Sequence, residues 1–406
     1  MQSLLKKLHQ LNIKIDLLDD KLNIQAPKGA ITDDLLNEIK IHKNDLIAFI
    51  RLHTDKAGYL KIPKVGEDVS YELSSSQFRL WLLSQFQEGN IAYNMPSLYE
   101  FKGILNVASL ENALAAIIDR HESLRTLFIE DQYGNVRQII LNSEDIKFKL
   151  GYEDLSNELN REEKINKVIY SEANFSFDLS SDCLFRAKLI KTSDNTYMFS
   201  IVMHHIISDA WSCEVMISEI LILYNTYLNN TTNSLPSLQL QYKDYAAWQK
   251  NLLKGDSIKG HKEYWVNLYE KKIPLLNLPQ SMKRPLIKTY RGKSSSRLYD
   301  KGLLKKVNDI CLAQECTLFM GLFAAVNTLL YRYSNQTNII IGTPSANREH
   351  LELHNQIGLY VNTLALKTEF SGSDSYRTLL EKIKEVTLAA YEHQILRANI
   401  KLFSQV

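Results

Sequence analysis

The sequence has few features of membrane, secreted or metal-binding proteins. No run of about 18 apolar residues occurs, and the N-terminus lacks the continuous apolar segment of a signal peptide. Among 406 residues there are four cysteines without a CxxC pair, which disfavours a zinc site and indicates reduced thiols. They are Cys183, Cys213, Cys311 and Cys316. The net charge of +2 gives no strong field for nucleic acid or an anionic membrane. We therefore expect a cytoplasmic protein that binds neither of these and holds no metal.

The first 55 residues are predicted to form a small unit of their own. Leucines at helical spacing precede two expected strands, Ile13–Leu18 and Lys21–Gln25. Thr32 is the expected N-cap of a following helical segment, which forms either one helix or two helices divided near Lys43. A unit of this size has a thin core, so we expect it to gain stability by pairing.

The stretches "LNIKIDLLDDKLNIQAPKGAIT" and "IKIHKNDLI" in this unit resemble the TubC-type N-terminal docking domain of peptide and hybrid synthetases. The resemblance implies an αββαα fold that forms a homodimer. It also implies that the edge of the β-hairpin receives a C-terminal docking segment from an upstream synthetase, by strand addition. The alternative is an N-terminal cap packed permanently on the next domain.

The remainder of the chain alternates helical and strand patterns. Residues 56–69 are predicted to be a linker, because Gly, Pro and polar residues occur there without periodicity. Residues 70–235 and 236–406 then form two α/β halves in succession. Such an arrangement favours a site in the cleft between two lobes.

Two adjacent histidines, His204 and His205, end an apolar strand in "MFSIVMHHIISDAWS". Neighbouring side chains on a strand point to opposite faces, so they cannot both serve one site, and metal binding is disfavoured. A serine hydrolase is disfavoured too, since no GxSxG motif occurs. One imidazole at a strand end suits the positioning or deprotonation of an amine or hydroxyl. Asp209 either caps the next helix or holds a buried arginine.

"MHHIISDAWS" resembles the HHxxxDG motif of non-ribosomal peptide synthetase condensation domains. Other core motifs of that family have counterparts in the same order. These are "SSSQFRLWLL", "RHESLRTLF", "YKDYAAWQ", "IGTPSANR" and "IGLYVNT". The resemblance implies an α/β (α+β) pseudo-dimer of two chloramphenicol-acetyltransferase-like lobes, arranged in a V around a tunnel.

The resemblance also implies a reaction and its site residues. A donor carrier protein presents an acyl or peptidyl thioester, and the amine of an aminoacyl group on an acceptor carrier attacks it. His205 orients or deprotonates that amine, and His204 supports it. Asp209 is structural, with Arg125 as its expected salt-bridge partner.

Arg120 and Asn362 are weaker candidates for the tunnel or its surroundings. No cofactor is expected on this chain itself, since the phosphopantetheine arms belong to the donor and acceptor peptidyl carrier proteins. Together with the "YNMPS" stretch, the motifs look more like the class that joins an L-configured donor to an L-acceptor.

The sequence departs from the family pattern at two places, and these departures leave more than one function open. Ala210 replaces the glycine of the histidine motif, and the added methyl either has no effect or narrows the tunnel. After His393 and Gln394, the "HQ" motif loses its expected proline and acidic residue, and we expect the final strands of the second lobe to be missing. The chain is then either a working condensation enzyme or a truncated, catalytically impaired fragment that only docks or binds. A free acyltransferase that uses coenzyme A is a third alternative.

Overall fold

In the computed structural model, contacts divide the chain into two units, Met1–Pro63 and Lys64–Val406. Their common boundary falls inside the predicted linker. The structure describes residues 4, 13–18, 21–26, 31–41, 43, 46, 61–86, 90–270, 273–279 and 292–396.

The first unit contains a β-hairpin and a helix. Strands β1 (Lys14–Leu18) and β2 (Lys21–Gln25) pair antiparallel, as the sequence predicts to within one residue. The predicted helix is confirmed as α2 (Asp33–Ile41), and the Thr32 hydroxyl accepts a hydrogen bond from the Leu35 N–H at 3.3 Å. The rest of the predicted helical segment lies largely outside the described residues. A small apolar core consists of Leu4, Ile13, Leu35, Ile39 and Leu46.

The second unit begins with a four-stranded sheet in the order β4-β9-β8-β7. Its strands are β4 (Asn94–Lys102), β9 (Thr196–His204), β8 (Phe185–Ser193) and β7 (Gly151–Asp154). Only the β7–β8 pair is parallel among these neighbours. The last six residues of β9 are all buried, because this strand lies inside the sheet.

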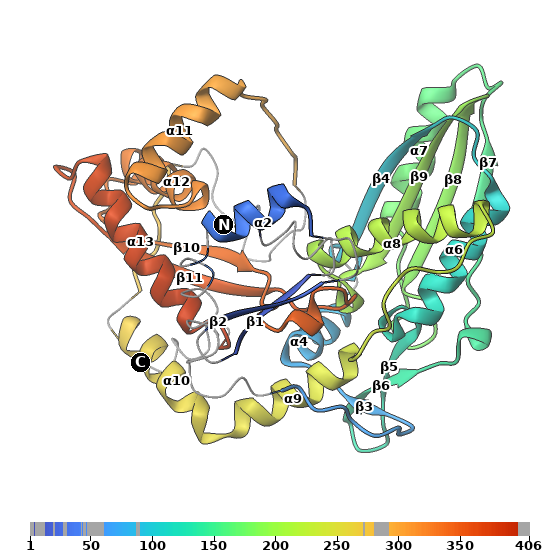
Figure 1. Ribbon diagram of the computed structural model, residues 1–406, viewed down its shortest axis with the longest axis horizontal. Coiled ribbons are helices and arrows are strands. Elements are labelled where there is room, and N and C mark those ends of the chain that lie inside the picture. The colour runs from blue at the N-terminus through green and yellow to red at the C-terminus, as the bar shows by residue number, and fades with distance from the viewer. Residues whose placement is uncertain are drawn as a thin grey trace. The chain divides into compact units, whose positions relative to one another are not determined.

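Three helices pack around this sheet (Figure 1). Helices α6 (Val107–Arg120) and α8 (Ala210–Leu228) contact each other, and α7 (Arg161–Ala173) contacts β4, β8 and β9. Four of the six buried residues of α6, Leu110, Leu114, Ile117 and Ile118, repeat at intervals of three and four, which places them on one face of the helix. The sheet and helices together carry the site described below.

A smaller sheet in the order β3-β6-β5 adjoins this region. It consists of β3 (Tyr71–Glu72), β6 (Val136–Ile140) and β5 (Thr126–Glu130). Helix α4 (Ser75–Ser84) follows β3 and starts with a capping box between Ser74 and Gln77. This helix contacts η3 (His205–Ile207), the short turn that carries His205.

The later half of the unit pairs β10 (Asn338–Ser345) with β11 (Asn362–Glu369) in antiparallel register. Figure 1 shows α12 and α13 near these two strands, and both helices contribute to their apolar core. The helices of this half are α9 (Tyr242–Lys254), α10 (Lys259–Leu268), α11 (Lys301–Ala313), α12 (Leu318–Ser334) and α13 (Tyr376–Glu392). The short turns are η1 (Glu122–Arg125), η2 (Ser143–Asp145), η4 (Asp256–Ile258) and η5 (Leu351–Leu353). The predicted alternation of helix and strand in both halves is therefore confirmed.

No single helix within the described ranges is long and apolar enough to cross a membrane. Helices α11 and α12 are long and apolar enough only when they are counted together, and the chain bends by 101° between them.

Candidate active site

The two histidines lie where β9 gives way to the η3 turn. His204 ends the strand and is fully buried, whereas His205 opens the turn and is only partly buried. The backbone N–H of His205 donates to the Tyr93 carbonyl at 2.8 Å, which fixes the turn to the segment before β4. The two rings therefore have different surroundings, as the alternation of side chains on a strand predicts.

His204 holds the turn. Its Nδ1 accepts a hydrogen bond from the Ile206 N–H at 3.2 Å, so the proton of the neutral ring is on Nε2. That Nε2 is buried, and a weak interaction with the Asn90 backbone partly offsets the effect of burial. Burial, and to a lesser degree the neighbouring His205, lowers the pKa of His204 to about 3. The ring thus stays neutral near pH 7 and acts as a fixed hydrogen-bond acceptor.

His205 has the opposite tautomer. Its Nδ1 lies 2.5 Å from the Ser208 carbonyl oxygen, and a carbonyl can only accept, so Nδ1 carries the proton. The neutral ring then presents the lone pair of Nε2. A ring held in this way can position an N–H group or take its proton.

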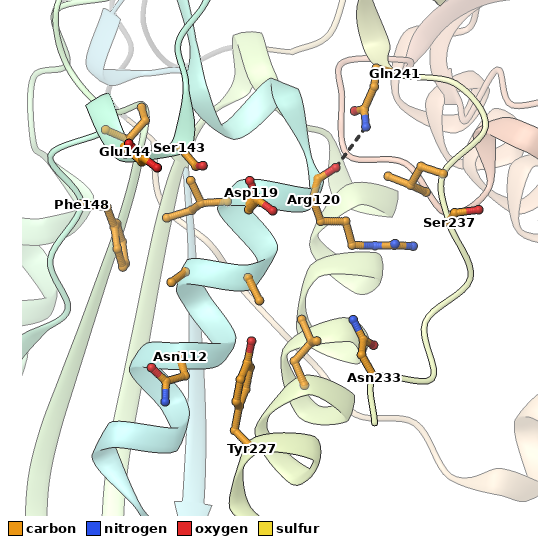
Figure 2. Close-up of a pocket in the computed structure, with 16 residues that line it drawn as sticks. Asn112, Asp119, Arg120, Ser143, Glu144, Phe148, Tyr227, Asn233, Ser237 and Gln241 are labelled. Carbon is orange, nitrogen blue, oxygen red and sulfur yellow. Dashed lines mark hydrogen bonds between the residues drawn. The ribbon is translucent and has the colours of Figure 1, made fainter. Parts of the chain in front are cut away.

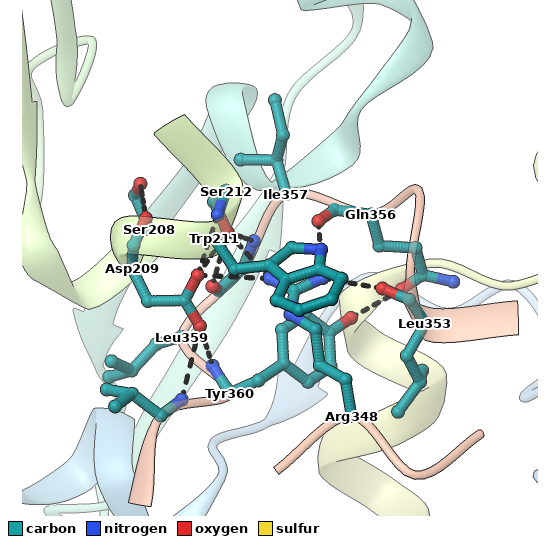
Figure 3. Close-up of polar contacts among 12 residues, drawn as sticks. Ser208, Asp209, Trp211, Ser212, Arg348, Leu353, Gln356, Ile357, Leu359 and Tyr360 are labelled. Carbon is teal, nitrogen blue, oxygen red and sulfur yellow. Dashed lines mark hydrogen bonds and ion pairs between the residues drawn. The ribbon is translucent and has the colours of Figure 1, made fainter. Parts of the chain in front are cut away.

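Asp209 caps the start of helix α8 and is almost fully buried (Figure 3). Its Oδ1 accepts from the N–H and the hydroxyl of Ser212, at 2.8 and 2.7 Å. Its Oδ2 accepts from the backbone N–H groups of Tyr360 and Val361, at 3.0 and 3.2 Å. Asp209 is therefore a helix cap and also joins α8 to the segment before β11.

The arginine that pairs with Asp209 is Arg348, whose Nη2 lies 3.1 Å from Oδ1. Nη1 of Arg348 donates to the carbonyls of Leu353 and Gln356, at 2.5 and 2.7 Å. Its guanidinium also lies 4.1 Å from the centre of the Tyr360 ring. Figure 3 shows these contacts converging on one buried cluster from both halves of the unit.

The prediction that Arg125 pairs with Asp209 is wrong. Nη1 of Arg125 donates to the Leu141 carbonyl at 2.5 Å. Arg125 directly precedes β5, and Leu141 directly follows β6, so the pairing of these two strands keeps the guanidinium at their end. Arg348 closes the "IGTPSANR" motif, but nothing in that motif alone indicates that its arginine reaches Asp209.

Arg120 lies away from the histidine turn. Its Nε donates to Oε2 of Glu219 at 3.0 Å, and Nε2 of the buried His121 lies 2.7 Å from the same oxygen. Burial lowers the pKa of His121, so this ring donates to Glu219 in its neutral form.

Arg120 also lines a cavity of about 870 Å³ beside α6 and α8 (Figure 2). Asp119, Glu144 and Phe148 line the same cavity, together with Gln241, which donates to the Arg120 carbonyl. His205 is not among the lining residues, so this cavity is separate from the histidine turn.

Asn362 is buried at the start of β11, opposite Ser345 on β10. Its Nδ2 donates to the carbonyl of Gln394 at 2.5 Å, and its Oδ1 accepts from the Thr363 N–H. The structure thus connects Asn362 to the "HQ" pair.

Ala210 has an ordinary helical role. It is the first residue of α8, its side chain is exposed, and it is not among the described residues with positive φ. The backbone here does not require glycine.

Comparison with known proteins identifies the family to which the chain belongs. A family model of the condensation domain matches residues 67–399, and one of the TubC N-terminal docking domain matches residues 1–51. The chain belongs to the condensation domain family. The predicted family and fold class are thereby confirmed.

Curated relatives of this condensation domain include several gramicidin synthases. Linear gramicidin synthase subunits C and D of Brevibacillus parabrevis are 36% and 39% identical to it over 84% and 82% of the chain. Gramicidin S synthase 2 of Aneurinibacillus migulanus is 36% identical over 84% of the chain. The chain spans only 4%, 6% and 7% of the length of these three relatives.

Solved structures share the fold. The X-domain from teicoplanin biosynthesis has a TM-score of 0.74 and 25% identity, over 84% of this chain and 75% of that one. The first condensation domain of the calcium-dependent antibiotic synthetase, in complex with a substrate analogue, has a TM-score of 0.69 and 17% identity. That match covers 81% of this chain and 76% of the other.

Proposed function

We propose that this condensation domain forms an amide bond between two carrier-bound substrates. The donor is an acyl or peptidyl thioester, and the acceptor is an aminoacyl group whose amine attacks the thioester carbonyl. The observation that carries the proposal is the tautomer of His205, whose Nδ1–H is held by the Ser208 carbonyl so that Nε2 offers its lone pair.

The reaction needs one proton to move. The amine nitrogen forms a bond to the donor carbonyl carbon, the carbon–sulfur bond breaks, and the amine proton ends on the departing sulfur as a thiol. Nε2 of His205 either accepts that proton and returns it or only orients the amine. Both roles require the ring to be fixed, which the short Nδ1 contact and the Tyr93 carbonyl provide.

Two of the other predicted residues, His204 and Asp209, act in this proposal by holding His205. His204 fixes the turn through the Ile206 N–H, and Asp209 joins α8 to the later half of the unit. We assign the linker to residues 56–69 and the two lobes to residues 70–235 and 236–406. The ion pair of Asp209 with Arg348 connects the two lobes. The motifs support an L-donor and an L-acceptor.

We propose that residues 1–55 form the docking domain. This domain binds the C-terminal segment of an upstream synthetase. The β1–β2 hairpin supports this, because a two-stranded sheet has edges that can accept another strand. We also propose that it forms the homodimer typical of TubC-type domains. Titration of a labelled C-terminal synthetase peptide into the full chain tests the docking, and sedimentation tests the dimer.

The four cysteines, all in the described part of the chain, are unpaired. This supports a reducing compartment, and we place the reaction in the cytoplasm.

The experiment is to incubate the full chain with a loaded donor carrier and a loaded acceptor carrier, and to follow the acceptor by intact mass. Condensation adds the donor acyl mass to the acceptor carrier. A parallel reaction replaces the donor carrier by the same acyl group on coenzyme A. Transfer from coenzyme A alone would favour a free acyltransferase.

A second candidate function is binding without turnover, by a catalytically impaired condensation domain. One specific observation favours it: the "HQ" motif at His393 and Gln394 lacks its expected proline and acidic residue. If no carrier pair gives product while the docking peptide still binds the folded chain, this second function is preferred.

A further inference from the structure

Two histidines from distant parts of the chain meet in the later half of the condensation domain. His261 lies on α10, and His393 caps the end of α13. Their Nδ1 atoms lie 2.9 Å apart, which is a hydrogen-bond distance, and their rings cross at 74°. The pair belongs to the "HQ" motif region, for which the proposed reaction gives no role.

Two further contacts hold His393 against α10. Its ring stacks on Tyr264, with the ring centres 4.0 Å apart, and Nε1 of the buried Trp265 donates to its carbonyl at 3.0 Å. His393 is therefore attached to α10 through its ring face, its ring nitrogen and its backbone.

The next residue extends these contacts toward Asp209. The carbonyl of Gln394 accepts from Asn362, and its side chain contacts Ser345 and donates to Glu349 at 2.6 Å. Asn362 directly follows Val361, whose N–H donates to Asp209. A continuous series of contacts thus runs from the histidine pair to the cluster that holds the active turn.

A hydrogen bond between two Nδ1 atoms requires one donor and one acceptor. Two neutral rings satisfy it only as opposite tautomers. One additional proton can be accommodated on Nε2 of the donor ring, and the bond persists. A second proton leaves two N–H groups and two positive charges facing each other, and the bond is lost.

We propose that His261 and His393 form a proton-sensitive latch that fixes residues 393 and 394 to α10 and opens when both rings are charged. The inference does not depend on the proposed reaction, because it concerns the conformation of the chain. Opening requires acidic pH, because the second proton must bind to a ring that faces an already positive one.

Within the described part of the chain, Tyr264, Glu392 and Glu349 are titratable groups near His393 or the residue that follows it. Tyr264 faces His393 from α10; burial and then the charge of Glu392 raise the pKa of this tyrosine, so it stays neutral. Glu392 precedes His393 at the end of α13, and Glu349 lies beyond Gln394.

The first test is the tautomer state of the full chain. Histidine-selective ¹⁵N labelling with two-bond ¹H–¹⁵N correlation identifies which ring nitrogen carries the proton. At about pH 8 we expect His261 and His393 to show opposite tautomers. Two rings that both carry the proton on Nε2 would overturn the proposal.

The second test is a double-mutant cycle in thermal unfolding with His261→Gln, His393→Gln and the double variant. Glutamine retains hydrogen-bonding groups but does not titrate. At about pH 8 we expect each single variant to lower Tm by about 2 °C, with little further loss in the double variant. At about pH 5 we expect the variants to have the same Tm as the wild type or a higher one, because the latch is then open in the wild type. A deficit of the same size at both pH values, or full additivity, would overturn the latch.

Discussion

Arg348 and Asp209 are 139 positions apart in the chain, yet their side chains meet at 3.1 Å with only 1% and 2% of their surfaces exposed. The carboxylate accepts five hydrogen bonds from four residues, and the guanidinium also binds two backbone carbonyls. Such a buried pair is costly to break, because either partner alone would leave an uncompensated charge. The pair therefore fixes the start of α8, and with it the turn that carries His205, to the later half of the domain.

The first prediction is that Arg348→Ala destabilises the domain strongly. Removing one member of a buried ion pair costs about 3–5 kcal/mol in the free energy of unfolding. The matched control is Arg125→Ala, which loses one hydrogen bond to the Leu141 carbonyl and costs about 1 kcal/mol. Urea unfolding of both variants measures the difference, and equal losses would contradict the pairing described here.

The second prediction concerns His204 and pH. The folded state keeps this ring neutral down to about pH 3, whereas the unfolded chain takes up the proton below its ordinary value of 6.5. The stabilisation is complete above pH 6.5 and is lost as the pH falls toward 3, by roughly 1.4 kcal/mol per pH unit. His204→Gln should remove this contribution to the pH dependence of the free energy of unfolding, which is about 2 kcal/mol between pH 7.5 and 5. Parallel slopes in the wild type and the variant would show that His204 titrates normally in the fold.

The third prediction is that Ala210→Gly changes little. Ala210 has an exposed side chain at the first position of α8, where the backbone is helical. The substitution should cost less than about 1 kcal/mol and alter the rate of product formation by less than about threefold. Thermal unfolding and the carrier assay measure the two effects. A large gain in rate would mean that the methyl group obstructs the substrate path.

Features set by nearby residues were predictable from the sequence. The end of β9 at His204, the different burial of His204 and His205, and the capping of α8 by Asp209 all depend on residues within a few positions. Period-two and helical patterns determine such local structure.

The partner of Asp209 could not be found in the same way. Arg125 and Arg348 both lie in stretches that match family motifs, and neither pattern says which guanidinium reaches α8. The pairing of β5 with β6 excludes Arg125 as the partner of Asp209, because it keeps Arg125 beside Leu141. The histidine pair at His261 and His393 is likewise a contact across 132 positions, and no local pattern predicts it.

The most direct test of the proposed reaction is the single-turnover rate of His205→Ala, compared with Arg125→Ala, in the two-carrier assay. Circular dichroism and thermal unfolding first establish that both variants are folded. We expect His205→Ala to lose about 100-fold or more, because the amine loses the lone pair of Nε2, while Arg125→Ala stays within a few-fold of the wild type. A folded His205→Ala variant that forms product at the wild-type rate would contradict the account.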